Sequence, residues 1–112
     1  MNGFRLTLAP RPTWTDLARD LVASGAARAG LSVDRFADLL VLTEQVASDL
    51  LASATDRDVE VSLTAEDHRV DVVFQSETAP SEVTRLALGR LADRHWQESE
   101  DGAHLTGFSI GA

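Results

Sequence analysis

Apolar and polar residues alternate along several stretches of the chain, which is typical of strands with one buried face. The first stretch is FRLTL, residues 4–8. Residues 59–74 show the alternation twice, on either side of the turn sequence AEDH, and this predicts a β-hairpin. Residues 103–110, AHLTGFSI, predict a closing strand, in which Gly107 indicates a bulge or a close backbone approach.

Three other segments carry apolar residues at helical spacing. The first begins at Thr13, which has an acidic residue three positions later as in a capping box, and it is expected to stop near Gly30. The second and third begin after Ser32 and Ser81, which are good N-cap residues. The third helix is expected to reach Trp96, with the following QESEDG as a polar turn.

The predicted order of elements is therefore β-α-α-β-β-α-β. This order predicts an α+β fold, a two-layer sandwich in which three helices cover one face of a mixed or antiparallel sheet of about four strands. A chain of 112 residues is long enough for one hydrophobic core. We therefore expect a single domain over residues 1–112.

The second helix contains LLVLTEQVASDLLAS, residues 39–53, and it has two neighbouring apolar stripes. A helix of this kind is usually sandwiched between other elements. The second stripe nevertheless includes Glu44 and Ser48, and Asp49 follows directly. Their oxygens are suited to accepting a proton or ligating a metal. Spacing alone favours the alternative, in which these side chains lie at the solvent-exposed edge of the helix and have no chemical role.

Charge and composition exclude several classes of function. The net charge is −8, and the chain has ten arginines scattered singly and no lysine, which argues against direct binding of DNA or RNA. An acidic surface suits solubility or a basic protein partner. No apolar run approaches the roughly 18 residues of a membrane span, the N-terminus has no export signal, and there is no cysteine. These features favour a cytoplasmic protein.

The common catalytic motifs are absent from the sequence. His68, His95 and His104 do not have metal-ligand spacing, so we expect no metal site. Neither of the common glycine-rich phosphate loops occurs, and no serine lies in G-x-S-x-G.

The order of elements, together with VLTEQVASDLLASA at residues 41–54, resembles the GHKL (Bergerat-fold, histidine-kinase-like ATPase) superfamily. The likeness is greatest to the small bacterial anti-sigma-factor serine kinases, and it covers essentially the whole chain. In that family a helix carries E-x-x-x-N, in which the glutamate activates the attacking hydroxyl or water and the asparagine holds magnesium. The resemblance places Glu44 at the glutamate and Ser48 at the asparagine.

Three departures from the family pattern imply that the ATP site is degenerate, and the first is Ser48 in place of the magnesium-binding asparagine. The family has D-x-G-x-G after the second hairpin strand, whereas this chain has FQSETAP, with Gln75, Ser76 and Glu77 and no glycine. The glycine-rich ATP lid is missing as well, because SETAPSEV leads almost directly into the third helix. The resemblance thus implies a former nucleotide pocket that includes Ser48, Asp49 and Gln75, with Glu44 as a vestigial catalytic residue and no bound ATP or Mg²⁺.

The expected function is accordingly a non-catalytic, anti-sigma-like module that binds a sigma factor or an antagonist protein. Family members usually form homodimers, and the short strand at residues 4–8 offers an edge for pairing with a second copy. Two alternatives stay open. One is a divergent ATP-dependent serine/threonine kinase that uses Glu44 as its base, and the other is a small α+β protein with a structural or assembly role.

Overall fold

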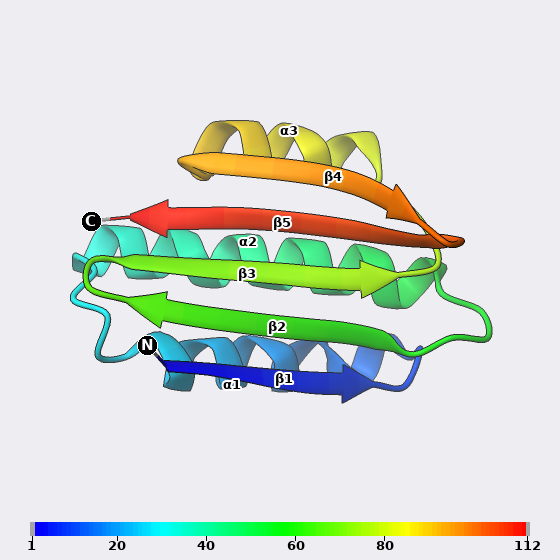
Figure 1. Ribbon diagram of the computed structural model, residues 1–112, viewed down its shortest axis with the longest axis horizontal. Coiled ribbons are helices and arrows are strands. Elements are labelled where there is room, and N and C mark those ends of the chain that lie inside the picture. Colours follow the sequence, from blue (N-terminus) through cyan, green and yellow to red (C-terminus); the bar gives the residue numbers. More distant parts are fainter. Residues whose placement is uncertain (1, 112) are drawn as a thin grey trace.

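Five antiparallel strands form a single sheet, and three helices lie on one side of it (Figure 1). The computed structural model describes residues 2–111, so Met1 and Ala112, the ends of the predicted domain, lie outside the described residues. The strands are β1 (Asn2–Leu8), β2 (Val59–Glu66), β3 (Arg69–Ser76), β4 (Arg94–Glu100) and β5 (Ala103–Gly111). The helices are α1 (Thr15–Ala26), α2 (Val33–Ser53) and α3 (Glu82–Leu91), preceded by the 3₁₀ turn η1 (Pro12–Trp14). The strand order in the sheet is β1-β2-β3-β5-β4.

The structure confirms an α+β fold and the order β-α-α-β-β-α-β, but it adds the strand β4, so the sheet has five strands rather than about four. The sequence had extended the third helix to Trp96, whereas α3 ends at Leu91 and Trp96 lies on β4. The remaining side chains of β4 are exposed, which is why this edge strand shows no alternation. The turn after it is only Asp101–Gly102, both in the left-handed region (φ 50° and 80°).

Two of the three predicted helix starts are confirmed. The hydroxyl oxygen of Ser32 accepts a hydrogen bond from the backbone N–H of Arg35 at 3.2 Å. The hydroxyl of Ser81 accepts one from the N–H of Thr84 at 3.4 Å. Each bond satisfies a donor that has no partner inside its own helix.

The predicted limits of the first helix are wrong at both ends. No side chain caps α1, which begins at Thr15 as a continuation of the 3₁₀ turn, with Pro12 at the start of that turn. The helix ends at Ala26, and Gly30 lies in the connection beyond it, where it adopts a left-handed conformation (φ 78°). Proline without an N–H suits a first turn, so Pro12 rather than the threonine hydroxyl sets where this helix begins.

The hydrophobic core lies between the sheet and the helices. Along β2 and β3 the buried positions alternate with partly exposed ones, as predicted for the hairpin. The fully buried strand residues include Val59, Val61, Val70, Val72, Phe74, Phe108 and Ile110. From α2, Leu39, Leu42, Val46 and Leu50 cover them. Burying one such side chain contributes roughly 1.5–3 kcal/mol, so this layer holds the fold together.

The helix α2 has one buried face, and the prediction that it is sandwiched on two faces is wrong. Ala37, Val41, Glu44 and Ser48 form a stripe on its outer side, and all four are exposed, with Val41 at 55%. No further layer covers this side of the helices. Two of the four residues, Ala37 and Val41, are apolar, and for this reason the sequence pattern indicated a second buried face. No helix within residues 2–111 is long and apolar enough to cross a membrane.

Candidate functional site

Glu44 lies on the outer face of α2, where it is exposed to solvent. Its Oε2 atom is 3.4 Å from a guanidinium nitrogen of Arg19 on α1. Arg19 also lies within 3.8 Å of Asp16 and 3.5 Å of Asp20. The predicted catalytic carboxylate is therefore part of a surface charge cluster, and one of its oxygens is engaged by an arginine.

Ser48 lies one helical turn beyond Glu44 on the same exposed stripe. Together with Val41 and Gln45, these two residues line a shallow hollow of about 340 Å³ on the outer side of α2. This is where the structure brings two of the predicted site residues together. Both side chains face solvent there, as the alternative interpretation, a solvent-exposed edge of the helix, predicts.

Asp49 faces α3 and joins the two helices. Its Oδ2 atom accepts hydrogen bonds from the backbone N–H of Ser81 and from the hydroxyl of Thr84, both at 2.7 Å. Gln45 adds a bond from its side-chain amide to the same threonine oxygen at 3.1 Å. The carboxylate thus lies at the positive end of the α3 dipole. Asp49 has a clear structural role in positioning α3 against α2.

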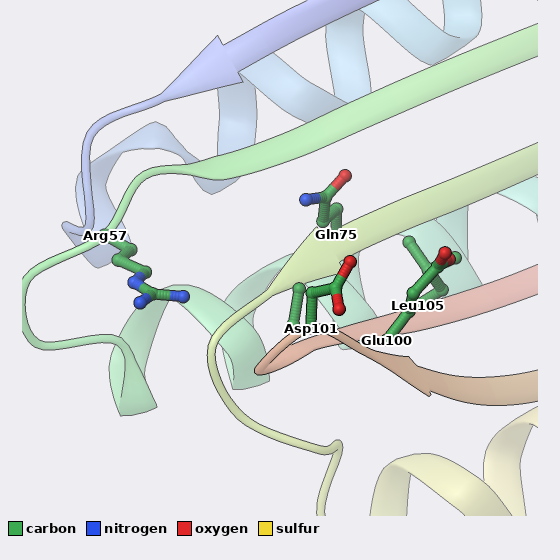
Figure 2. A pocket seen from close by; sticks show the side chains of 6 residues that line it. Arg57, Gln75, Glu100, Asp101 and Leu105 are labelled. Atoms are coloured by element: carbon green, nitrogen blue, oxygen red, sulfur yellow. The ribbon is translucent and has the colours of Figure 1, made fainter.

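Gln75 lies on the other side of the sheet from α2. It follows the fully buried Phe74 on β3, and successive side chains of a strand point to opposite faces. With Arg57, Glu100 and Leu105, among others, it lines a hollow of about 260 Å³ on the face that no helix covers (Figure 2). The structure therefore separates Gln75 from Glu44 and Ser48, the residues with which the resemblance grouped it.

Glu77 follows β3, at the place where the family has its glycine loop. Its Oε1 atom accepts hydrogen bonds from the backbone N–H groups of Thr55 and Asp56, the latter at 3.1 Å, and the hydroxyl of Thr55 donates to the same atom at 3.2 Å. The bond from the Thr55 amide is the largest cause of a lowered pKa for Glu77. This carboxylate ties the segment after β3 to the segment after α2. No local sequence pattern predicts that contact, because its partners lie 21 and 22 residues away.

The hollow around Gln75 has mixed charge. Figure 2 shows the Arg57 guanidinium on one side of it and the carboxylates of Glu100 and Asp101 on the other. Within residues 2–111 no three histidine, cysteine, aspartate or glutamate side chains are grouped so as to hold a metal ion. The described hollows are shallow surface features, and none gathers all the residues that the resemblance assigned to the pocket.

Comparison with solved structures finds a similar fold. Over 99% of its length, this chain is similar to the crystal structure of the RsbU and RsbW domains of Rv1364c from Mycobacterium tuberculosis, with a TM-score of 0.80 and 14% identity. At this identity the match shows a shared fold, and it confirms at that level the resemblance found in the sequence.

The chain spans 32% of the length of that matched chain. No protein family model matches the sequence, and no curated protein sequence does so either. The helix α2 and the segment after β3 are the two parts of the chain to which the resemblance in the sequence assigned the nucleotide pocket. The side chains found there are Glu44 and Ser48, which face solvent, and Asp49 and Glu77, which are engaged in the fold.

Proposed function

We propose that this protein is a non-catalytic regulatory module that acts by binding another protein, in the manner of an anti-sigma factor. One observation carries the proposal. Asp49 and Glu77, acidic groups at the place where the resemblance implies a former nucleotide pocket, bind backbone N–H groups of the chain itself. Those N–H groups belong to residues 55, 56 and 81, so both carboxylates are already engaged within the chain.

The short connection between β3 and α3 supports the same proposal. Five residues, 77–81, separate the last residue of β3 from the first residue of α3. Ser81 caps α3 and Glu77 binds the segment after α2, so both ends of the connection are held. A segment of this length has no room to wrap a triphosphate, and Glu77 adds a negative charge near the place where phosphates would lie.

Thermal unfolding in the presence of Mg-ATP tests the absence of nucleotide binding. We expect the melting temperature to be unchanged at millimolar Mg-ATP. A ligand at 100 times its dissociation constant adds about 2.7 kcal/mol of stability, which corresponds to a rise of roughly 10 °C in a domain of this size. A rise of that order would contradict the proposal. Mg-GTP at the same concentration controls for nonspecific effects of Mg²⁺ and phosphate.

The protein-binding part of the proposal needs its own experiment. Each sigma factor and each candidate antagonist protein encoded in the source genome would be purified and titrated against this protein by calorimetry. We expect one of them to bind, and a bound sigma factor to lose activity in transcription with purified RNA polymerase. If none binds, the protein is not an anti-sigma-like module, whatever the outcome with Mg-ATP.

One observation favours a second candidate, a divergent serine/threonine kinase. Glu44 and Ser48 are accessible beside the hollow on α2, so a substrate hydroxyl is able to reach the carboxylate. Incubation with labelled ATP and the bound protein partner decides between the two functions. We expect no transfer of label. Transfer that is lost in Glu44→Gln, but retained in the neighbouring Gln45→Glu, would establish the kinase instead.

A further inference from the structure

The helix α3 carries an apolar stripe on its outer side. Val83, Leu86, Ala87 and Arg90 recur at the spacing that places side chains on one helix face. Val83 is 66% exposed and Leu86 is 62% exposed. These four residues and Leu91 line a hollow of about 450 Å³, the largest of the described hollows and the most apolar. A concave apolar surface of this kind is typical of a protein contact.

The intramolecular contacts of α3 are made by a different face. Thr84 and Leu88 are fully buried, and Thr84 is bonded to Asp49 and Gln45 of α2. Ala87 and Leu91, at one side of the outer stripe, are partly buried against the core, whereas Val83, Leu86 and Arg90 are exposed. The exposed part of the stripe is therefore not needed to hold α3 on the molecule. In Figure 1, α3 lies beside β4 at the margin of the structure, where a second molecule has access to it.

Two opposite charges flank the outer stripe. Glu82 lies at its start and Arg90 near its end, and both are exposed. Within residues 2–111 neither side chain is in an ion pair or a side-chain hydrogen bond, so both charges are available to a second molecule. Each charge suits the dipole of its own helix end. The two opposite charges lie at the two ends of the stripe. A second copy of the helix in the reversed direction therefore places each charge beside its opposite.

We propose that a second copy of this chain docks on the outer stripe of α3, with the two α3 helices antiparallel around a twofold axis. An axis that passes near Leu86 and Ala87 brings Glu82 of each copy next to Arg90 of the other. The two ion pairs then flank an apolar centre formed by Leu86 and Ala87 from both copies. A symmetric dimer interface requires a surface that is complementary to itself, and this arrangement of charges meets the requirement.

The size of this surface sets the strength of the dimer. A helix of ten residues is about 15 Å long, so the contact buries less surface than a standard stable interface. The dimer is therefore a weak one that forms at protein concentrations of about 0.1 mM and above. This contact is distinct from pairing through the β1 edge, and it does not depend on the proposed binding of a sigma factor or antagonist.

Reversing each charge separately tests the contact. In Glu82→Arg the stripe carries two positive charges, and in Arg90→Glu it carries two negative ones, so each variant repels its own copies. We expect sedimentation equilibrium at about 0.1–1 mM to show monomers for each variant alone. An equimolar mixture of the two should form heterodimers, because each positive end then meets a negative one. The double variant should regain self-association.

The mixture also controls for folding, since a variant that had unfolded would not associate with the other. Arg85→Glu, on the same helix but off the stripe, should dimerise as the unaltered protein does. A protein that stays monomeric at 1 mM would overturn the proposal, and so would single variants that dimerise normally. A mixture that remains monomeric would also overturn it, because the two variants are fully complementary in this arrangement.

Discussion

At the scale of single residues, the carboxylate of Glu77 ties two segments of the chain together. It binds the amides of Thr55 and Asp56, at the position where the resemblance in the sequence expects a glycine-rich loop. These bonds favour the charged form of the side chain, and the Thr55 amide is the largest cause of its lowered pKa. The ionised form of the residue therefore stabilises the fold more than the protonated form does.

The stability of the protein should therefore depend on the charge of Glu77. Its pKa is lowered from an ordinary value of 4.5, so its contribution is fully present above that pH and is lost as the pH falls through the lower value in the folded state. Glu77→Gln should lower the melting temperature at pH 7 and reduce its fall between pH 5 and pH 3. Glu98→Gln, on the exposed strand β4, should leave both unchanged. Parallel pH curves for Glu77→Gln and the unaltered protein would contradict the assignment.

At the scale of elements, the pairing of β4 with β5 depends on a close approach between two residues. Trp96 lies opposite Gly107, and a Cβ atom added at Gly107 would be 2.2 Å from the indole ring. The ring therefore lies across the glycine on the face of the sheet without helices. The prediction of a close backbone approach at Gly107 is confirmed, and the register shows no bulge there.

Gly107→Ala should displace Trp96 and destabilise the protein by roughly 1–3 kcal/mol, as overpacking does elsewhere. Urea unfolding would measure the change. In the Trp96→Ala background the same substitution should cost clearly less, because the clashing ring is gone. Equal costs in both backgrounds would show that the ring does not lie over the glycine. Gly89→Ala, where an added Cβ atom has no neighbour closer than 4.0 Å, serves as a control.

The strands β2 and β3 and the helix α2 show what the sequence was able to predict. Each has one buried face, so the spacing of its apolar residues predicted its type and place in the chain, although the second apolar stripe of α2 proved to be exposed. The strand β4 is exposed along most of its length and carries no such pattern. The contacts of Asp49 and Glu77 join residues more than 20 positions apart, and a local pattern holds no information about them. Residue types identified the candidates, but only the fold determines what each one contacts.

At the scale of the whole molecule, Arg35 connects three distant parts of the chain. It lies in the first turn of α2, and its side chain binds the backbone oxygen of Leu91 at the end of α3 and that of Gly111 at the end of β5. It also pairs with Asp38 and Asp93, each at 2.8 Å. An arginine suits this place because its planar group has several donors in a fixed arrangement.

Arg35→Ala should reduce the free energy of unfolding by about 2–3 kcal/mol, because it removes four hydrogen bonds, three of them partly buried, and leaves two backbone oxygens without this donor. Arg35→Lys should recover only part of the loss, since an ammonium group cannot reach all of these acceptors at once. The control is Arg5→Ala, which removes one exposed ion pair with Glu60 and should cost less than about 1 kcal/mol. Urea unfolding gives all three values. If Arg35→Ala cost no more than the control, the helices and the two ends of the sheet would be held together by the apolar core alone.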